Sequence, residues 1–189
     1  MREVGVGRVL VASLHQGIAD TLPDRLNFYE NWLNAEGLRE GTIGLAPLSA
    51  VLSFMRQEGE AYHTITRRAG EYAAEWTVES MSPFERSFIR GAPSWVRRRL
   101  IVRLASQLVR ATYQASRATA RQRRGIVNLE VRGSLFCSVR EPVGQALCGF
   151  YAAACAKLMQ LFGEPASVQV ISCRGTGAPA CVVRIASQD

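Results

Sequence analysis

Three cysteines in the last third of the chain are the residues best placed to do chemistry together. Cys148 stands at the expected start of a helix, and Cys173 and Cys181 bracket the glycine-rich run RGTGAPA. If the β-branched segments on either side of that run pair as a hairpin, the last two cysteines lie near each other at the base of its loop. Such thiols can bind a metal ion, form a Cys173–Cys181 disulfide, or pack as small buried side chains, and all three alternatives stay open here.

The C-terminal 65 residues must position these cysteines, and their pattern predicts a ββαββ unit over 125–189. Apolar and polar residues alternate where strands are expected, and apolar residues recur at three- and four-residue spacing where the helix is expected. The expected elements are strands over 126–131 and 135–139 joined by a tight turn at Arg132-Gly133, a helix over 144–162 ended by Gly163 and Pro165, and strands over 168–173 and 181–185.

The preceding residues are predicted to be helical. Expected are a helix over 8–20, a second over 21–37 with Thr21 and Asp24 as caps, a loop over 39–46, helical structure from Pro47 to about Trp76 with a break near Gly59, and one more helical turn between 81 and 93. The fold class expected is therefore α+β. We expect a single domain over 1–189, with a mainly helical part (1–124) packed with the antiparallel sheet unit (125–189).

A long helix expected from Ser94 to about Arg124 carries arginines along one face, among them Arg103, Arg110 and Arg117. Residues 1–90 hold nine basic and twelve acidic side chains, net −3, whereas residues 91–189 hold fourteen and four, net +10. The arginine ridge could therefore meet an acidic partner protein or an anionic membrane surface. Nucleic acid is disfavoured because no binding motif accompanies the charge, and a solvated helix face is the plain alternative.

The segment LCGFYAAACAKLMQLFGEPASVQVISCRGTGAPACVVRI resembles the 4-vinyl reductase domain family, especially bacteriochlorophyll 4-vinyl reductase-like proteins. That family is related in fold to the transport protein particle subunits of vesicle tethering and to the phenol- and toluene-sensing domains of bacterial activators. The resemblance implies an α+β module that binds a ligand or a partner, and a homodimer.

In the phenol-sensing relatives, three cysteines and a glutamate hold a structural zinc, and Cys148, Cys173 and Cys181 match the cysteine positions. The resemblance therefore implies zinc as a structural cofactor. The glutamate has no counterpart here, and structural zinc is nearly always four-coordinate. Cys155 is a poor substitute because seven helical residues separate it from Cys148 by roughly 10 Å. Cys137 is the better candidate for the fourth ligand.

Aromatic residues of the helices are the candidate ligand-binding residues. Their spacing is typical of a packed core, but the related sensory and tethering domains hold hydrophobic ligands between helices and sheet. The resemblance implies such a cavity in this chain. Its candidate lining residues are Phe28, Trp32, Phe54, Tyr62 and Phe150.

Catalytic motifs are absent from the sequence, which contains no G-x-G-x-x-G, P-loop, HExxH or GxSxG pattern, and its two histidines, His15 and His63, lack local acidic or cysteine partners. We therefore expect a non-catalytic binding module for a hydrophobic small molecule, aromatic or tetrapyrrole-like, that acts as a sensor or carrier through a partner protein. The alternatives are an enzyme or accessory factor of bacteriochlorophyll biosynthesis, and an assembly or tethering scaffold.

A cytoplasmic location is expected from three features of the sequence. Five cysteines without dense spacing fit a reducing compartment better than a disulfide framework. The N-terminal apolar run is too short for a signal peptide, and no apolar stretch is long enough to cross a membrane.

Overall fold

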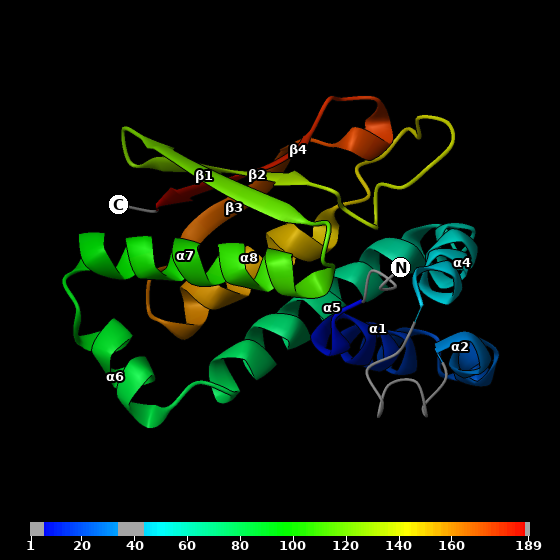
Figure 1. Cartoon of the computed structure of the whole chain (residues 1–189), viewed down its shortest axis with the longest axis horizontal. Helices are drawn as coiled ribbons and strands as arrows, with labels where there is room; N and C mark the ends of the chain where they lie inside the picture. The colour runs from blue at the N-terminus through cyan, green and yellow to red at the C-terminus, as the bar shows by residue number, and fades with distance from the viewer. Residues whose placement is uncertain (1–5, 34–43, 188–189) are drawn as a thin grey trace.

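The fold is described by a computed structural model for residues 6–33 and 44–187 (Figure 1). The helices are α1 (Arg8–Thr21), α2 (Leu26–Leu33), α4 (Leu45–Arg56), α5 (Glu60–Glu79), α6 (Pro83–Gly91), α7 (Ser94–Thr112) and α8 (Gly149–Leu161), with short 3-10 turns at Pro23–Arg25 and Arg174–Thr176. The strands are β1 (Arg117–Arg123), β2 (Ile126–Arg132), β3 (Ala166–Ser172) and β4 (Cys181–Ser187). The expected α+β class, helices first and an antiparallel sheet last, is confirmed.

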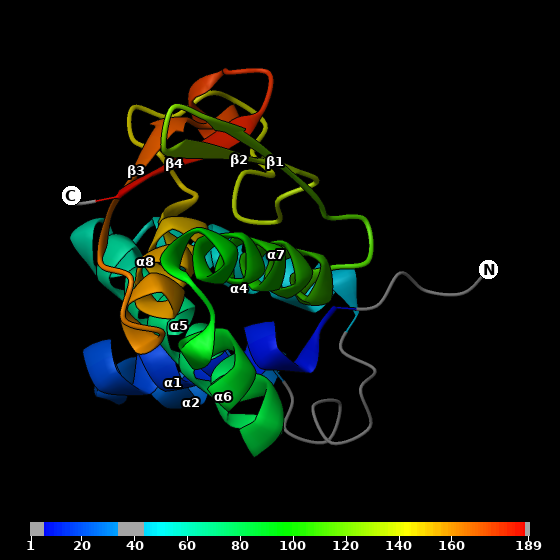
Figure 2. The same cartoon turned by 90° about the vertical axis from the view of Figure 1, so that its left-hand side faces the viewer.

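The molecule is layered, with the sheet on one side and the helices stacked beneath it. The four strands are antiparallel in the order β1-β2-β4-β3. Helices α7 and α8 lie against one face of this sheet, and α5 and α1 form the next layer (Figures 1 and 2). Alternate residues of β2 are buried, among them Val127, Leu129 and Val131, and they belong to one core that extends from the sheet through the helix layers.

The first hairpin lies earlier in the chain than predicted. The long helix does not reach Arg124 but ends at Thr112, and residues 117–123 form the edge strand β1. The turn falls at Arg124 and Gly125, whose φ angles of 49° and 77° suit a two-residue hairpin, and not at Arg132-Gly133. The sequence RATARQR consists largely of helix formers, and it is a strand because β2 offers it a full set of backbone partners.

The predicted strand over 135–139 was also wrong, because this segment is part of a loop that runs from 133 to 148. Its apolar residues Leu135, Phe136 and Cys137 are buried, which explains why the segment looks like a strand in the sequence. The loop is held from below by Arg56 of α4, whose guanidinium donates to the carbonyl oxygens of Phe136 and Ser138 at 3.2 and 3.4 Å.

Most N-terminal predictions are confirmed, with shifted boundaries. The helical break at Gly59 occurs between α4 and α5, and α1 covers the first predicted helix. The second helix begins later than expected, after the turn at Pro23–Arg25, and its predicted end at Gly37 lies outside the described residues, as does most of the predicted loop over 39–46. The expected single turn between 81 and 93 is the nine-residue helix α6, which starts with a Ser82–Glu85 capping box.

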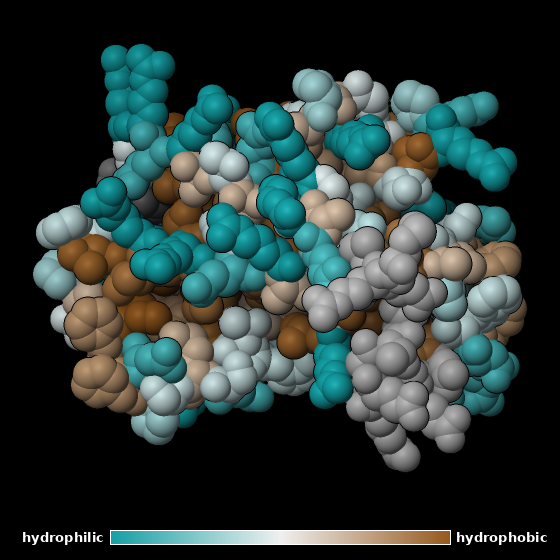
Figure 3. Space-filling view, viewed as in Figure 1, coloured by the Kyte–Doolittle hydropathy of each residue, from teal (hydrophilic) through white to brown (hydrophobic). Residues whose placement is uncertain are grey.

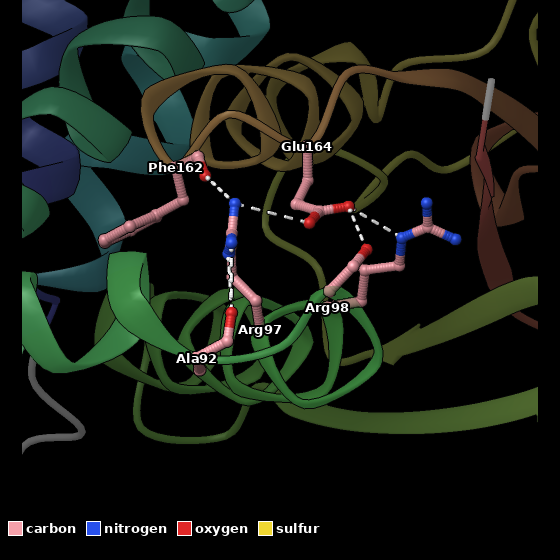
Figure 4. Close-up of polar contacts among 6 residues, drawn as sticks. Ala92, Arg97, Arg98, Phe162 and Glu164 are labelled. Atoms are coloured by element: carbon pink, nitrogen blue, oxygen red, sulfur yellow. Dashed lines mark hydrogen bonds and ion pairs between the residues drawn. The ribbon is translucent and has the colours of Figure 1, made fainter. Parts of the chain in front are cut away.

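A buried carboxylate ties the start of α7 to the turn after α8 (Figure 4). Glu164 is 6% exposed; its Oε2 accepts hydrogen bonds from the Arg98 guanidinium at 2.7 Å and the Ser94 hydroxyl at 2.9 Å. Arg97 lies 3.5 Å from the other carboxylate oxygen and donates to backbone carbonyls on both sides, of Ala92 and Phe162. Burial on its own would raise the pKa of Glu164, but the hydrogen bonds from Arg98 and Ser94 and the two guanidinium charges outweigh it and lower the pKa.

This network predicts a pH-dependent stability difference. Glu164→Gln should lower the free energy of unfolding by about 2 kcal/mol near neutral pH, because the arginines lose a buried partner. Because the folded-state pKa is depressed, the wild-type advantage is present above the unfolded-state pKa and disappears as the pH falls through the folded-state value. Urea denaturation at pH 7 and below pH 4 measures the difference in free energy of unfolding between the wild type and Glu164→Gln. The exposed Glu141→Gln is the matched control, and a Glu164→Gln deficit that stays constant with pH would contradict the prediction.

Candidate metal centre and ligand groove

Four cysteines from four different segments meet where the 133–148 loop, the start of α8 and the β3–β4 hairpin come together. Cys137 comes from the 133–148 loop, Cys148 precedes the first residue of α8, Cys173 follows β3, and Cys181 begins β4. All four are buried, and their sulfur atoms all lie within 4.8 Å of one another. The Sγ of Cys137 is 3.4 Å from that of Cys173 and 3.3 Å from that of Cys181. The four thiols therefore surround one common point.

Backbone N–H groups already point at two of these sulfurs. The N–H of Leu147 donates to Cys173 at 3.3 Å, and that of Arg174 donates to Cys181 at 3.4 Å. Hydrogen bonds with the other three thiols, that of Cys137 most of all, lower the pKa of Cys173. Hydrogen bonds with Cys137 and Cys173 raise the pKa of Cys148. N–H donors of this kind stabilise thiolates, which are the form of cysteine that binds metals.

The structure brings the three cysteines matched in the sequence together, and it adds Cys137 as the fourth. Cys155 lies outside the cluster, in the helical interior, where burial raises its thiol pKa to about 12. All five cysteines are free, so the Cys173–Cys181 disulfide considered from the sequence is not formed. The N–H of Val143 donates to the carbonyl of Gly175 and holds the loop on the hairpin, and Arg56 holds the loop on α4.

The five aromatic residues predicted to line a cavity do not meet. Phe28, Trp32 and Phe54 form a cluster at the surface of α2 and α4, with 37–46% of each residue exposed. Tyr62 and Phe150 are fully buried, but in a filled core: the Phe150 ring stacks on Phe136 with centroids 4.9 Å apart, and the Tyr62 hydroxyl donates to the Leu147 carbonyl at 3.0 Å. The structure therefore does not bring these five residues together around one pocket.

A groove that the sequence did not predict lies instead between α5, α8 and β3, with a volume of about 930 Å³. Small residues of α8 form its floor, and polar side chains of α5 and α8 form its sides. The lining includes Gly149, Ala152, Ala153 and Ala156 among the small residues, and His63, Arg67, Glu71, Lys157 and Gln160 among the polar ones. The alanines at 152–154 and 156 were the sequence signal for the groove, because alanines on a helix leave room beside it.

Gly70 sets how closely the two helices approach below this groove. A Cβ atom at this position would lie 2.3 Å from the backbone oxygen of Phe150 and 3.0 Å from the Cβ of Ala153. Only glycine fits there, so α5 and α8 pack at backbone distance.

Of the charged side chains that line the groove, Arg67 and Glu60 form no ion pair with another described residue. Lys157 is paired with Glu75 at 2.7 Å, and Glu71 is paired with Arg68 at 3.0 Å. Within the described residues no carboxylate pairs with Arg67, which is exposed. The guanidinium of Arg67 is therefore available to an anionic group.

The predicted arginine ridge is divided between two elements. Arg103 and Arg110 are exposed on α7, but Arg117 is the first residue of β1, because the helix ends before it. Two of the three side chains are partly engaged by backbone: Arg110 donates to the Ala118 carbonyl, and Arg117 donates to that of Gln114. A single continuous ridge on one helix is therefore not formed. Among the described residues, no helix is both long and apolar enough to cross a membrane.

Comparison with known proteins gives a likeness in fold only. No family model matches the chain, and no curated protein matches it. Among solved structures, an H-NOX protein from S. oneidensis in an Fe(II)NO ligation state has a TM-score of 0.55 at 12% identity, covering 97% of this chain and 99% of its own. An Fe(II) unliganded H-NOX mutant from K. algicida has a TM-score of 0.61 at 11% identity, covering 97% of both. The chain has an H-NOX-like fold.

This finding corrects two expectations. The resemblance to the 4-vinyl reductase and transport protein particle families is wrong, because neither appears among the similar structures and no family model supports it. The bacteriochlorophyll role inferred from that resemblance is not supported either. The expectation of zinc is also contradicted, because the similar H-NOX structures are in Fe(II) states. The resemblance rested on the spacing of cysteines and glycines, which many α+β hairpins can share.

The residues of this chain do not fit an iron cofactor such as a heme that must also bind a gas. Its two histidines are peripheral: His15 pairs with Glu30 on the surface at 2.7 Å, and His63 stands in the side of the open groove. The space between helices and sheet is filled by aromatic rings such as Phe136 and Phe150 and by the four thiols. Four protein sulfurs also leave no open position for a gaseous ligand.

The close approach at Gly70 gives a stability prediction. Gly70→Ala should lower the free energy of unfolding by about 2 to 3 kcal/mol, because the added methyl group meets a backbone oxygen that cannot move without shifting α8. Urea denaturation measures it. Gly91→Ala is the control, since a Cβ there would have no neighbour within 4 Å, and it should be neutral. Equal stability of the two variants would show that α5 and α8 are not held at this distance.

Proposed function

We propose that the chain is a non-catalytic module that binds a small molecule in the groove of α5, α8 and β3, and that it acts as a sensor or carrier through a partner protein. The observation that carries this proposal is the groove itself: about 930 Å³ is the size of many small-molecule sites, and small apolar residues of α8 line it together with polar side chains that could orient a ligand. The H-NOX-like fold supports it, because the similar proteins are described in ligand-bound and unliganded forms.

The groove selects for a particular chemistry. The floor of alanines and Gly149 offers a smooth apolar surface to a flat body, such as an aromatic ring system. Arg67 offers a planar guanidinium with no carboxylate partner among the described residues, which suits a carboxylate, sulfonate or phosphate. The ligand class proposed is therefore a flat, apolar molecule with one anionic group.

We further propose that the four-cysteine cluster holds a metal ion that prefers thiolate ligands. Four sulfurs that lie within 4.8 Å of one another, two of them accepting backbone N–H bonds, offer four soft ligands to one metal ion. It would join the 133–148 loop, the start of α8 and the β3–β4 hairpin. Because Cys148 directly precedes Gly149, the metal would also fix one end of the groove.

The metal proposal predicts one metal ion per chain in protein purified without a histidine tag. Cys137→Ser, Cys148→Ser, Cys173→Ser and Cys181→Ser should each lower metal content at least fivefold, whereas the control Cys155→Ser should retain it. Elemental mass spectrometry measures the content and identifies the element, and Co²⁺ added to metal-free protein should give the visible absorption of tetrahedral thiolate coordination. Folded wild-type protein that contains no metal and gives no Co²⁺ spectrum would refute the proposal.

The groove proposal predicts binding of 8-anilinonaphthalene-1-sulfonate, a flat apolar anion. Ala156→Trp fills the groove and Arg67→Glu reverses the unpaired charge, so each should weaken binding at least tenfold as measured by fluorescence titration. Arg140→Glu is the control for the charge change, because Arg140 lies on an exposed loop outside the groove. Unchanged binding in both groove variants would place the probe elsewhere and would contradict this site.

A further inference from the structure

The most exposed large apolar side chains in the described part of the chain gather at the α6–α7 corner. Phe84 and Phe88 of α6 are 78% and 60% exposed, and Trp95 in the first turn of α7 is 67% exposed. The rings of Phe84 and Phe88 stack on each other, one helical turn apart, with centroids 6.5 Å apart. Exposing three large aromatic rings to water is costly, so their concentration in one place indicates a surface that is covered in use.

The corner is built firmly enough to present these rings. Helix α6 begins with Pro83 and a reciprocal Ser82–Glu85 capping box, and its one buried residue, Ile89, anchors it to the core. The turn into α7 is fixed by Arg97, which donates to the Ala92 carbonyl and lies 3.5 Å from the buried Glu164 (Figure 4). The aromatic rings therefore project from a rigid corner.

Positive charge surrounds these rings. Residues 83–112 carry seven arginines and only one glutamate, and that glutamate is the helix cap Glu85. Arg99 and Arg103 follow Trp95 at four-residue intervals, so all three stand on one face of α7, and all are exposed. Arg103 also lines a hollow of about 230 Å³ together with Phe84 and Phe88. Figure 3 shows the apolar area over α6 beside a hydrophilic band over α7 and β1.

We propose that this corner docks on the surface of an anionic lipid bilayer, with Phe84, Phe88 and Trp95 inserted at the headgroup level and Arg99 and Arg103 against the lipid phosphates. Aromatic side chains favour that depth, and basic side chains beside them gain from the negative surface potential. The attachment is peripheral. It would bring the small-molecule module to a membrane, and it is independent of whether the groove binds a ligand.

An acidic protein surface could also attract the arginines. The rings favour the bilayer, because Phe84 and Phe88 project beyond a shallow hollow, and a protein partner would need a matching apolar cleft for them, whereas a bilayer needs none.

The test is sedimentation of the full chain with vesicles of phosphatidylcholine alone or of equal parts phosphatidylcholine and phosphatidylglycerol. We expect binding to the anionic vesicles only, weakened by high salt. Arg99→Gln with Arg103→Gln should reduce the partition coefficient roughly 30-fold at low salt, since each arginine near an anionic surface contributes about a factor of five. Phe84→Ala with Phe88→Ala should reduce it at least tenfold, and Trp95 fluorescence should shift to the blue on binding.

Matched variants separate this corner from general charge or aromatic content. Phe28→Ala with Phe54→Ala removes two exposed rings on α2 and α4, and Arg121→Gln with Arg123→Gln removes two exposed arginines on β1; both should bind as wild type. The proposal would be overturned if the wild-type chain did not sediment with anionic vesicles. It would also be overturned if vesicle binding were lost in the Arg99→Gln, Arg103→Gln variant but kept in the Phe84→Ala, Phe88→Ala variant. A chain that is dimeric in solution, becomes monomeric with Phe84→Ala and Phe88→Ala, and ignores vesicles would assign the corner to a second copy instead.

Discussion

The backbone contact between α5 and α8 is the constraint on which the functional part of this molecule depends. With glycine at position 70, the two helices approach until the α5 backbone meets the carbonyl of Phe150. This distance lets the hydroxyl of Tyr62, two turns earlier on α5, reach the carbonyl of Leu147 just before α8. That hydrogen bond fixes the residue whose own N–H donates to Cys173. A packing contact without polar character thus sets the geometry of the thiol cluster.

The groove and the thiol cluster are consequences of the same arrangement. The α8 helix begins at Gly149, directly after Cys148, so its first residues belong to the groove while the preceding one belongs to the cluster. Small residues of α8 are needed both where it packs against α5 and where it lines the groove, because larger side chains would separate the two helices and would also fill the groove. The run of alanines is therefore a requirement of packing and a source of open surface. Any ligand in the groove would press on the helix that starts at the cluster.

Sequence patterns predicted this chain best where local signals and tertiary contacts agree. The β3–β4 hairpin, α8 and the break at Gly59 follow from periodicity and glycine, and the grouping of Cys137 with the other thiols follows from the need for a fourth donor nearby. The β1 strand could not be found, since RATARQR is made of helix formers and becomes a strand through its pairing with β2. The positions of the five aromatic residues could not be predicted, because spacing does not reveal whether a side chain lies at the surface or in a filled core, as Phe150 does beside Phe136.

The likeness to H-NOX proteins and the absence of a suitable iron site are compatible, because a fold fixes backbone paths and the side chains fix the chemistry. A gas-binding iron needs an interior cavity, an axial ligand and an open coordination position. Here the interior between helices and sheet is occupied by stacked rings and by four sulfurs that point inward, and both histidines lie at the periphery. The groove lies beside α8 and begins at Gly149, directly after Cys148 of the cluster. In this chain the scaffold therefore offers an open groove beside a sulfur-rich cluster, and a ligand in the proposed site would be recognised by shape and charge and not by a metal.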